Sequence, residues 1–498
     1  MKKILIRADA SREIGIGHVM RCLALAQGWQ DYLGGKVFFV LGTRAPTLEN
    51  RLIREGIEVI HIGSPLGSVE DASKTALLAR ENGAHWIVVD GYHFGAEYQK
   101  TIKDAGLSLL FIDDYGHTDH YYADIVLNQN IYADMSLYKN YEPYTRFLLG
   151  AKYALLRREF LAWTEHKRDI PDIARKVLIT FGGSDPDNVT LKVIEALKKI
   201  EIDRLDVITV VGGVNQNYKT IRQSVKERPG FSVRKDVNNM PELMAWADVA
   251  ISAGGSTCWE LVFMGLPSIL CPVAENQMSN VRFLKSKGLV KCIRTDDISN
   301  LEVTAKKITN LLISHNERNL LSQNMKRLVV GEGSRCIFMH MGEKKIQLRR
   351  VKKSDCKIIW EWVNDPVVRN SAFRQDTIPW NEHEQWFKEK ISNPNCIIFI
   401  LSSRQKKLIG QIRFDVKDGN AEVDVSIDKK FRECGMGSYL IMEGVRKFVE
   451  LTKIFRIHAH IKSHNITSIR SFEKSNFKIT NMTRVQNFDV VHMIWERV

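Results

Sequence analysis

The sequence predicts an α/β protein with two Rossmann-like lobes followed by a smaller α+β domain. Short β-rich runs alternate with helical patterns over residues 1–155, and the same alternation returns over residues 156–340. Such alternation is typical of βαβ units that build a parallel sheet. From about residue 345 the pattern changes to strand-like runs in succession and then a helix, so we expect a third domain over residues 345–498.

Length and composition agree with this organisation. The chain has 498 residues, enough for about three domains of ordinary size. Its 44% apolar and 26% charged content excludes a disordered chain, a collagen and a coiled coil. There is no run of 18 apolar residues, and Arg7 and Asp9 interrupt the start of the chain before a signal peptide could form. We therefore expect a cytoplasmic protein without a membrane partner.

The net charge of +14 is concentrated in the third domain. Residues 344–498 contain 29 Lys+Arg and 18 Asp+Glu, whereas the first 343 residues contain 43 and 40. A basic domain suits a small polyanion such as CoA or a nucleotide as well as it suits nucleic acid. Because the chain has no basic run of five residues, we expect small-molecule ligands and no nucleic acid. The sequence says nothing of the oligomeric state.

The predicted strands place the ligand between the lobes. They are ILIRA, KVFFVL, EVIHI, WIVVD and LLFID in the first lobe, and VLITF, DVITVV, DVAISA and SILCPV in the second. The charged stretch LLRREFLAWTEHKRD is expected to form a connecting helix. Open parallel sheets bind ligands at the carboxyl ends of their strands, so two such lobes predict a site where those ends face each other.

The first strand leads into the glycine-containing turn Gly15-Ile-Gly17-His18. Glycines let the backbone approach a ligand, and the N–H groups of the helix that starts near His18 can bind an anion. The turn is no dinucleotide fingerprint, because Met20 stands where a third glycine belongs, and no P-loop motif follows. His18 is either a general base near neutral pH or a residue beside a helix cap that bonds a loop carbonyl.

Residues 4–28, ILIRADASREIGIGHVMRCLALAQG, resemble the opening of the UDP-sugar hydrolases of pseudaminic-acid biosynthesis. That family has a two-lobed fold similar to GT-B glycosyltransferases. The resemblance implies that His18 activates water for attack at the anomeric carbon, with UDP as the leaving group. It also implies a sugar site bordered by Asp9, Arg12 and Gly17 and lined by a tyrosine. The candidate tyrosine is Tyr92 in VVDGYHF, and the alternative is a half-buried aromatic residue at a strand end.

Two Gly-Gly-Ser turns follow strands of the second lobe. One is Gly182-Gly183-Ser184 and the other is Gly254-Gly255-Ser256-Thr257, with Glu260 one turn into the next helix. Small residues and helix N–H groups can hold a pyrophosphate, and a carboxylate can accept from ribose hydroxyls. Either turn alone is more often structural, but the pair at neighbouring strand ends favours a nucleotide.

The second turn is similar to the nucleotide-binding stretch of GT-B enzymes that use UDP-sugars. The resemblance implies that Ser256 and Thr257 contact phosphate and that Glu260 contacts ribose. It further implies that Asn276 and Gln277, in the turn after the next strand, face the sugar or the diphosphate.

No metal is predicted. The eight cysteines are scattered singly, without a C-x-x-C pair, which argues against a structural zinc site. One loop crowds together oxygen and nitrogen ligands that could hold a divalent ion, but such a run is more often a solvated turn. Its residues are Asp113, Asp114, His117, Asp119 and His120.

The last domain carries Arg432-Glu-Cys-Gly435-Met-Gly437-Ser438 between the strand AEVDVSI and a helix. Successive N–H groups there can hold a pyrophosphate, and the arginine adds positive charge. The pattern resembles motif A of the GNAT acetyltransferases, and residues 465–477 resemble their next motif. The resemblance covers nearly all of residues 347–498 and implies acetyl-CoA as co-substrate. The residues implied to bind it are Val425, Ile427, Arg432, Gly435, Gly437, Ser438 and Asn465.

The residues expected to bind the acceptor amine match the family patterns less closely. Glu422 can deprotonate the attacking amine directly or through water, or it is a solvent-facing carboxylate. Phe472 stands where many GNAT enzymes have a tyrosine that protonates the leaving thiolate, which phenylalanine cannot do. The helices WEWVNDPVVRN and EHEQWFKEKI resemble those of acetyltransferases acting on a UDP-4-amino sugar, although Val363 replaces an expected arginine. The implied acceptor-side residues are Trp362, Asn364, His383 and Trp386.

The resemblances together imply a bifunctional enzyme of nonulosonic-acid biosynthesis. The GNAT-like domain is expected to acetylate the 4-amine of a UDP-linked 4-amino-4,6-dideoxy-N-acetyl-altrosamine. The GT-B-like lobes are expected to hydrolyse UDP from the resulting UDP-2,4-diacetamido-2,4,6-trideoxy-β-L-altrose. Three alternatives stay open: a glycosyltransferase joined to an acetyltransferase, an inactive UDP-sugar sensor, and a GNAT domain that acts on a protein amine.

Overall fold

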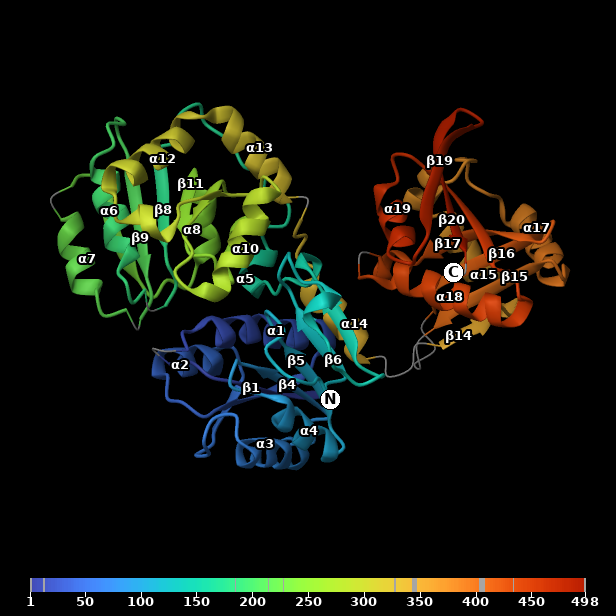
Figure 1. Cartoon of the computed structure of the whole chain (residues 1–498), viewed down its shortest axis with the longest axis horizontal. Coiled ribbons are helices and arrows are strands. Elements are labelled where there is room, and N and C mark those ends of the chain that lie inside the picture. Colours follow the sequence, from blue (N-terminus) through green and yellow to red (C-terminus); the bar gives the residue numbers. More distant parts are fainter. Residues whose placement is uncertain are drawn as a thin grey trace. The chain divides into compact units, whose positions relative to one another are not determined.

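A computed structural model describes residues 2–11, 14–183, 185–213, 215–226, 228–326, 328–342, 347–402, 408–432 and 434–496. The chain divides into two compact units, Met1–Phe338 and Met339–Val498 (Figure 1). The structure confirms the predicted fold class, with two parallel sheets in the first unit and an α+β arrangement in the second. Among the described residues we find no helix with the length and apolarity that crossing a bilayer requires.

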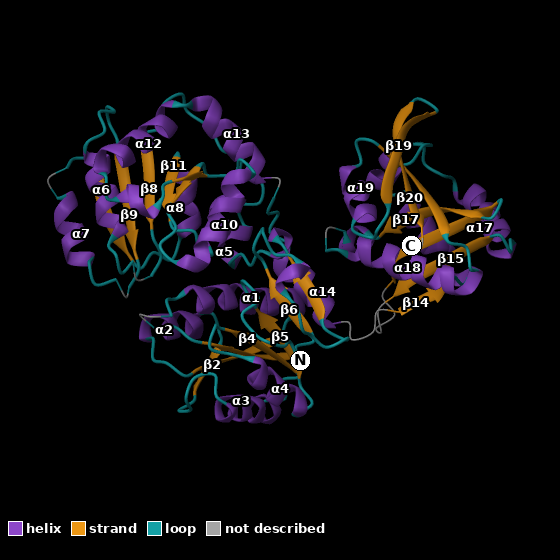
Figure 2. Ribbon diagram, viewed as in Figure 1, coloured by secondary structure: helices purple, strands orange, loops and turns teal. Residues whose placement is uncertain are grey.

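The first lobe is a parallel sheet of seven strands in the order β3-β2-β1-β4-β5-β6-β7. Its central strands are buried on both faces, which explains their nearly continuous apolar runs. Helices α3 and α4 pack on one face and α1 covers the other (Figure 2). The strands are β1 (Lys3–Ala8), β2 (Lys36–Leu41), β3 (Glu58–His61), β4 (Trp86–Asp90), β5 (Ser108–Ile112), β6 (Ile125–Asn128) and β7 (Arg146–Leu149). The helices are α1 (Gly17–Leu33), α2 (Pro46–Arg54), α3 (Val69–Glu81) and α4 (Ala96–Asp104), with short 3-10 turns at Met135–Leu137 and Ala151–Tyr153.

The second lobe is a parallel sheet of six strands in the order β10-β9-β8-β11-β12-β13. Helices cover both of its faces and enclose two apolar clusters. The strands are β8 (Lys176–Thr180), β9 (Asp206–Val211), β10 (Phe231–Lys235), β11 (Val249–Ser252), β12 (Ser268–Leu270) and β13 (Lys291–Cys292). The helices are α5 (Arg158–Leu161), α6 (Val189–Lys198), α7 (Tyr218–Val225), α8 (Met240–Trp246), α9 (Thr257–Phe263), α10 (Glu275–Ser286), α11 (Thr295–Ile298), α12 (Leu301–Ile313) and α13 (His315–Lys326). Helix α14 (Gly333–Gly342) returns to the first lobe, where Phe338 meets Trp29 of α1 edge-on with ring centroids 5.4 Å apart.

Two sequence expectations need correction in this unit. The strands β6, β7, β10 and β13 were missed, because they are short or, in β10, carry exposed polar residues. The stretch expected as a connecting helix is helical only over α5. Beyond it, Arg168 donates hydrogen bonds to the backbone carbonyls of Met244, Ala247 and Met264, so tertiary contacts hold this charged segment against the second lobe without a helix.

The second unit is a mixed sheet in the order β14-β15-β16-β17-β18-β20-β19, in which only β17 and β18 pair in parallel. Helix α18 packs on one face, and α15 and α17 pack on the other. The strands are β14 (Gln347–Arg350), β15 (Cys396–Ser402), β16 (Leu408–Lys417), β17 (Asn420–Ile427), β18 (Arg456–Lys462), β19 (Lys478–Val485) and β20 (Phe488–Glu496). The helices are α15 (Cys356–Val363), α16 (Pro366–Ser371), α17 (Trp380–Ser392), α18 (Met436–Thr452) and α19 (Ile466–Glu473), with 3-10 turns at Lys353–Asp355 and Lys429–Phe431.

A buried charge network fixes the start of the first lobe. Arg7 in β1 is fully buried and bonds both oxygens of Asp71 in α3, at 3.0 and 2.8 Å. Its Nη1 atom lies 2.6 Å from Asp9 at the end of the strand. Such a pair does not by itself make a protein more stable than an apolar core would, but removing one partner leaves an uncompensated buried charge.

We therefore expect Arg7→Met to destabilise the first unit by about 3–5 kcal/mol, because the carboxylates of Asp9 and Asp71 lose their cation. The control Lys36→Met removes an exposed pair with Glu58 and should cost less than about 1 kcal/mol. Urea unfolding followed by tryptophan fluorescence measures both changes. Equal losses of unfolding free energy in the two variants would show that the buried pair of Arg7 contributes no more to stability than an exposed pair.

Candidate active sites

His18 lies at the start of α1, where the glycine turn after β1 brings it to the carboxyl ends of the strands. Its Nδ1 atom is 2.6 Å from Oδ1 of Asp90, the last residue of β4. The guanidinium of Arg21, one turn further along α1, donates to both oxygens of this carboxylate at 2.5 and 2.6 Å. Because β4 pairs with β1, the strand order itself brings the fully buried Asp90 under the helix.

The charge of Asp90 decides which ring nitrogen of His18 carries the proton. Burial raises the pKa of the Asp90 carboxyl, but the charges of Arg21 and His18 and their hydrogen bonds outweigh it and hold this pKa well below its ordinary value. An ionised carboxylate only accepts hydrogen bonds, so a neutral imidazole donates from Nδ1 and keeps a lone pair on Nε2. This tautomer is the one that a general base requires.

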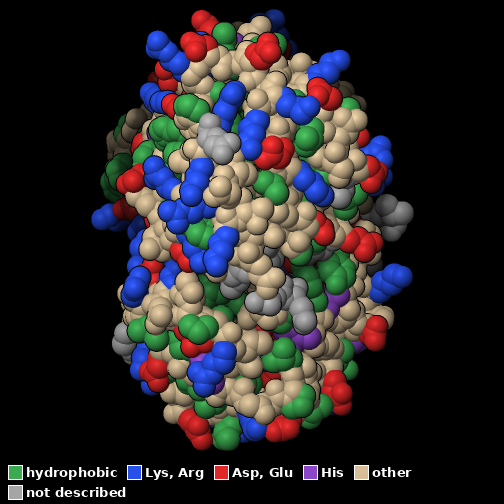
Figure 3. All heavy atoms as spheres, turned by 90° about the vertical axis from the view of Figure 1, so that its left-hand side faces the viewer, with side chains coloured by type: hydrophobic (Ala, Val, Ile, Leu, Met, Phe, Trp, Pro, Cys, Tyr) green, Lys and Arg blue, Asp and Glu red, His purple; other side chains and the backbone are tan. Residues whose placement is uncertain are grey.

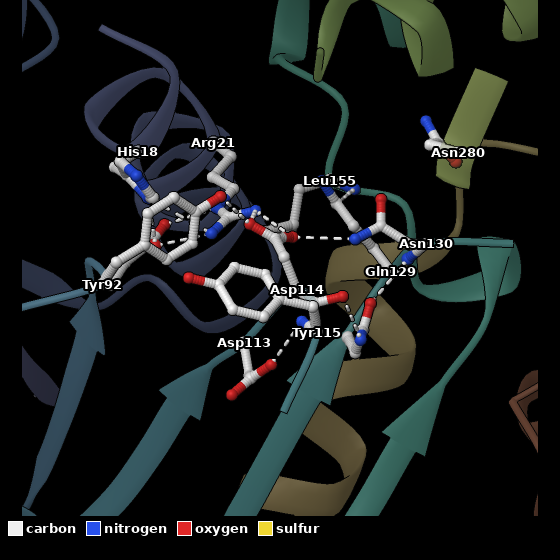
Figure 4. Close-up of polar contacts among 12 residues, drawn as sticks. His18, Arg21, Tyr92, Asp113, Asp114, Tyr115, Gln129, Asn130, Leu155 and Asn280 are labelled. Atoms are coloured by element: carbon white, nitrogen blue, oxygen red, sulfur yellow. Dashed lines mark hydrogen bonds and ion pairs between the residues drawn. The ribbon is translucent and has the colours of Figure 1, made fainter. Parts of the chain in front are cut away.

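A second carboxylate, Asp114, extends the network into the loop after β5 (Figure 4). It accepts from Arg21 at 2.8 and 3.0 Å, from the Tyr92 hydroxyl at 2.7 Å and from Asn130 at 2.8 Å. The Tyr92 ring meets the His18 ring edge-on, with the two centroids 4.8 Å apart. Tyr92 is thus beside His18, where the sequence analysis expects it, and it is 37% exposed.

Asp9 has a different place from the one expected. Its side chain is fully buried at the end of β1, and its oxygens accept from the Gly42 backbone N–H, from Arg7 and from His93. A carboxylate without accessible surface holds the turn after β1 and does not line a sugar site. Arg12, the other residue expected at the sugar, lies outside the described residues.

Glycine turns from both lobes approach one another at the carboxyl ends of the two sheets. A methyl group added to Gly17 would lie 3.9 Å from Oγ of Ser256. One added to Gly183 would lie 2.8 Å from Cγ1 of Ile16, which is closer than carbon atoms tolerate. Three of the predicted residues, Gly17, Gly183 and Ser256, therefore lie where the two lobes approach, and a side chain at position 183 would displace that of Ile16.

Gln277, at the start of α10, uses its side-chain oxygen for hydrogen bonds within the protein. Its Oε1 atom accepts from the backbone N–H groups of Gly254 at 3.0 Å and Val273 at 3.1 Å. These bonds tie the glycine turn after β11 to the strand end after β12 and leave the amide nitrogen of Gln277 for a ligand. The side chain of Asn276 and the whole of Ser184, both expected at the ligand, lie outside the described residues.

Glu260 also serves the framework. Thr257 begins α9, and one turn later Oε1 of Glu260 lies 2.9 Å from both Nε and Nη2 of Arg157. Burial raises the pKa of the Glu260 carboxyl, and the charge of Arg157 opposes this shift. The ion pair binds α9 to the segment that connects the lobes, so ribose could reach only the other carboxylate oxygen.

The loop considered as a metal site folds as a turn. Oxygens of Asp113 accept from the backbone N–H groups of Tyr115 and Gly116, at 2.7 and 2.6 Å, and from the Tyr121 hydroxyl at 2.6 Å. Asp114 is engaged by Arg21. Within the part of the chain that the structure describes, no three His, Cys, Asp or Glu side chains are grouped so that they could hold a metal ion.

A basic hollow in the second lobe is separate from these turns. Lys and Arg side chains are numerous on the face shown in Figure 3. Arg222, Lys226 and Arg228 line a hollow of about 490 Å³ beside the start of β10. That is the amino end of the sheet, whereas the glycine turns follow the carboxyl ends of β8 and β11. The hollow is therefore not the predicted nucleotide site.

In the second unit, the turn after β17 leads directly into α18. Gly435 has a φ of 80°, a left-handed conformation that favours glycine, and the 17-residue helix begins at Met436. The first N–H groups of α18 lack intrahelical partners, and Gly437 and Ser438 lie in that first turn. The turn offers backbone N–H groups that could meet an anion, and the binding of CoA there stays a prediction.

Arg432 stands before this turn. It donates to the Ile427 carbonyl at 2.9 Å and to Asp365 at 2.7 Å. Its Nη2 atom is buried and has no hydrogen-bond partner in the described part of the chain. A buried guanidinium nitrogen without a partner is costly unless a ligand accepts from it.

The neighbouring strands β17 and β18 pair at only two positions, the second of which joins Glu422 to His458. Beyond that point the strands separate, and the side chains of Val425 and Ile427 pack toward the core. Their backbone keeps its partners on β16, so an extended ligand could bond the opposite edge. Asn465 caps α19 by accepting from the Ser468 N–H at 3.2 Å, and it borders a hollow of about 430 Å³ beside α16.

The residues expected on the acceptor side are mostly framework. Trp362 is 3% exposed and donates to Asp428 at 2.9 Å. Asn364 exchanges two hydrogen bonds with the backbone before α17, at 3.0 and 2.8 Å. His383 is 2% exposed, with Nε2 3.1 Å from a carbonyl at the start of α15, and the Trp386 ring packs under an arginine. These aromatic and polar groups hold the helices together because their polar atoms find partners inside the unit.

Several residues that lie beside the predicted ones were not predicted from the sequence. Asp90 and Arg21 surround His18, and two sequence signals were available, since His18 and Arg21 share one helix face and Asp90 ends a strand. Glu422 lies 3.0 Å from Nδ1 of His460, which the sequence analysis did not single out. Phe472 is 6% exposed and packs in the apolar core of the unit.

Two family models match the chain. Residues 177–330 match the glycosyltransferase family 28 C-terminal domain, which corresponds to the second lobe. Residues 345–478 match the acetyltransferase (GNAT) domain, which corresponds to most of the second unit. The chain therefore carries a GNAT acetyltransferase domain behind a lobe of glycosyltransferase type, as the sequence resemblances imply.

Similar proteins cover the chain to different extents. An uncharacterized protein of Methanocaldococcus jannaschii is 25% identical over 97% of this chain and 98% of its own length. A UDP-2,4-diacetamido-2,4,6-trideoxy-beta-L-altropyranose hydrolase of Campylobacter jejuni is 27% identical over 57% of this chain and 97% of its own length. A spermidine N-acetyltransferase structure from Vibrio cholerae, with CoA and spermine, is 18% identical over 31% of this chain and 96% of its own, with a TM-score of 0.29. The chain is an enzyme in which a part similar to nucleotide-sugar hydrolases is joined to an acetyltransferase domain.

The carboxylate of Asp90 should fix the protonation of the His18 ring. We expect nitrogen NMR of the neutral imidazole to show the proton on Nδ1 in the wild type, because an ionised acceptor lies 2.6 Å away. In Asp90→Asn the amide nitrogen can donate to Nδ1, so the proton should move to Nε2. An unchanged proton position in this variant would contradict the role given to Asp90.

Proposed function

We propose that the first unit hydrolyses a UDP-sugar of the pseudaminic-acid route, releasing UDP from UDP-2,4-diacetamido-2,4,6-trideoxy-β-L-altrose. The observation that carries this proposal is the His18–Asp90 pair at the strand ends, 2.6 Å between donor and acceptor. The Campylobacter jejuni relative named for this reaction supports the choice of substrate. The proposal therefore joins the geometry of a general base to the chemistry named for a similar protein.

The reaction needs a base, a leaving group and a place for each. Nε2 of His18 takes a proton from water as the water oxygen bonds to the anomeric carbon. The bond from that carbon to the UDP oxygen breaks, and UDP leaves with the electron pair. The proton stays on His18, whose imidazolium is stabilised by the ionised Asp90 on the opposite nitrogen. Tyr92, edge-on to the ring, lines the sugar side.

The glycine turns suit the UDP. Gly183, Ser256 and Thr257 offer backbone N–H groups and hydroxyls where the two lobes approach, and α9 begins there. The amide nitrogen of Gln277 and the second oxygen of Glu260 are the remaining polar groups for diphosphate and ribose. Together these groups would hold the nucleotide with its sugar directed toward His18.

The second unit is proposed to transfer the acetyl group of acetyl-CoA to the 4-amine of the UDP-linked precursor. The N–H groups of the turn from Gly435 to Ser438 and the unpaired nitrogen of Arg432 would hold the pyrophosphate of CoA. The backbone of Val425 and Ile427, where β17 leaves β18, would bond the extended arm of CoA. Acetylation would come first, and its product would be the substrate of the hydrolase in the same chain.

A second candidate function is transfer of the sugar to an acceptor other than water. The match of residues 177–330 to a glycosyltransferase domain favours it. The two reactions differ in their products, since a glycosyltransferase leaves little free sugar in water alone. Incubation in ¹⁸O-labelled water distinguishes them, because hydrolysis at the anomeric carbon puts the label into free sugar and none into UDP.

His18→Ala should lower the rate of UDP release by about 10²–10⁴-fold, because the attacking water loses its base. Acetylation of the precursor by the same variant should be unchanged, so the acetylated UDP-sugar accumulates. His85→Ala is the control, since His85 is exposed just before β4, at the opposite end of the strand from Asp90. Phosphorus NMR and mass spectrometry follow both products, and UDP release by His18→Ala at the wild-type rate would refute the assignment.

Arg432→Ala should raise the KM for acetyl-CoA about 10- to 100-fold, the usual cost of a lost hydrogen bond to a charged group. UDP release from the acetylated sugar should stay the same. Arg446→Ala is matched to it, because Arg446 is 60% exposed on α18 and pairs with Glu443 and Glu450 of its own helix. A thiol assay measures free CoA, and equal KM values in the two variants would contradict the role of Arg432.

A further inference from the structure

Three imidazoles and a carboxylate form a cluster on the sheet of the second unit. Glu422 comes from β17, His458 and His460 from β18, and His492 from β20. Residues of even number on these strands share one face, and the alternate residues Ala421, Ile457, Ala459 and Met493 pack into the apolar core. The cluster therefore lies on the face opposite α18.

The contacts within the cluster are close and ordered. Nδ1 of His460 is 3.0 Å from Oε1 of Glu422. The ring of His492 stacks on those of His460 and His458, with centroids 4.7 and 5.2 Å apart and planes within 6°. Nδ1 of His458 lies 2.9 Å from Nε2 of His492, so one of the two donates and the other accepts.

The position of the cluster matters more than its composition. Glu422 and His458 form the last pair before β17 and β18 separate, and His460 is the next residue on this face of β18. The separated backbone is where the acetyl-CoA arm is proposed to bind, so this inference rests on the proposed acetyl transfer. The side chain of His460 is 31% exposed, and that of Glu422 is 65% exposed. An acceptor amine could therefore reach both.

Acetyl transfer to an amine needs a group that removes a proton from the ammonium ion, and this cluster offers one. At neutral pH an alkyl amine is mostly an ammonium ion, and it attacks a thioester only after it loses a proton. Burial, the cationic Arg456 and the neighbouring histidines lower the pKa of His458 and of His492. The two rings beside His460 thus stay neutral near pH 7 and add no repulsion to a proton arriving there.

The charged groups that face His460 are few. Glu422 and Asp424 are on β17, Lys462 is two residues along β18, and Arg456 and Glu496 pair at the far end of β18 and β20. Glu422 alone among them has an ion-pair contact with His460 in the described part of the chain. Lys462 is directed to a backbone carbonyl of α16 and to the Phe488 ring.

We propose that His460 is the general base of acetyl transfer and that Glu422 positions it. The Glu422 carboxylate, 3.0 Å from Nδ1, would favour a proton on that nitrogen and a lone pair on Nε2, which no described residue bonds. That nitrogen takes a proton from the ammonium group. The amine nitrogen then bonds to the thioester carbonyl carbon, the carbon–sulfur bond breaks, and CoA leaves as a thiolate. The second proton of the nitrogen passes to the thiolate or to water as the amide forms.

This assignment changes the role predicted for Glu422. A carboxylate is as a rule a weaker base toward an ammonium ion than an imidazole is. A carboxylate 3.0 Å from Nδ1 can hold the ring in place while the ring takes up the proton. Glu422 is therefore assigned the role of a positioning residue, and His460 that of the base.

The test measures kcat/KM for acetylation of the UDP-4-amino sugar by the full-length chain between pH 6 and pH 10. We expect His460→Gln to lose about 10²–10⁴-fold at pH 7. The loss should shrink steadily as the pH rises and the free amine becomes abundant, because a free amine needs no base for attack. Glu422→Gln should lower kcat by a smaller factor and shift the acidic limb of the pH profile to lower pH, with an unchanged KM for acetyl-CoA, because a base without a neighbouring carboxylate loses its proton at lower pH.

Two comparisons make the result decisive. Glu496→Gln removes a comparably exposed carboxylate from the same face and should leave the pH profile as in the wild type. UDP release by His460→Gln and its calorimetric affinity for CoA report whether the variant is folded. A loss of equal size at every pH, or no loss at all, would overturn the role of His460. Absence of acetylation by the wild type at every pH would overturn the proposed acetyl transfer itself, and this inference with it.

Discussion

The first unit depends on one buried carboxylate, that of Asp90. It receives Nδ1–H from His18 and two hydrogen bonds from Arg21, so it joins β4 to two positions of α1. Arg21 in turn binds Asp114, which orients Tyr92. Because these groups are removed from water, their interactions are strong and poorly screened, and each depends on the others. The buried polar groups in the core of the lobe thus fix the position of the His18 ring.

The second unit uses the same pairing of carboxylate and imidazole at a more exposed place. Glu422 and His460 lie at the point where two parallel strands part, and solvent reaches both side chains. Water screens the Glu422–His460 pair more than it screens His18 and Asp90. The exposed carboxylate of Glu422 therefore orients its imidazole ring more weakly than Asp90 does. In both units the carboxylate contacts Nδ1 of the imidazole, and Nε2 is the other ring nitrogen, the one proposed to take the proton.

Several polar residues that look like ligand contacts in the sequence are structural in the molecule. Asp9 is buried under the first turn, Gln277 ties two strand ends together, and Trp362 joins a helix to the loop after β17. Residues near a site must also hold the loops that form it, and buried polar atoms need partners inside the protein. A sequence motif therefore shows where in the fold a site lies more reliably than it shows what each side chain does there.

The sequence by itself determined the fold class, from the alternation of strands and helices, and the glycine turns at the strand ends. Hydrophobic periodicity and glycine are local signals, so one sequence suffices to recognise them. It also singled out His18, because that residue follows a glycine turn at the end of the first strand. Only the tertiary structure decided which residues surround it. Asp90 and Asp114 are distant from His18 along the chain. His460 and His492 lie on the paired strands β18 and β20, which α19 and β19 separate in the sequence. Strand pairing sets these neighbours, and pairing depends on the packing of the whole sheet.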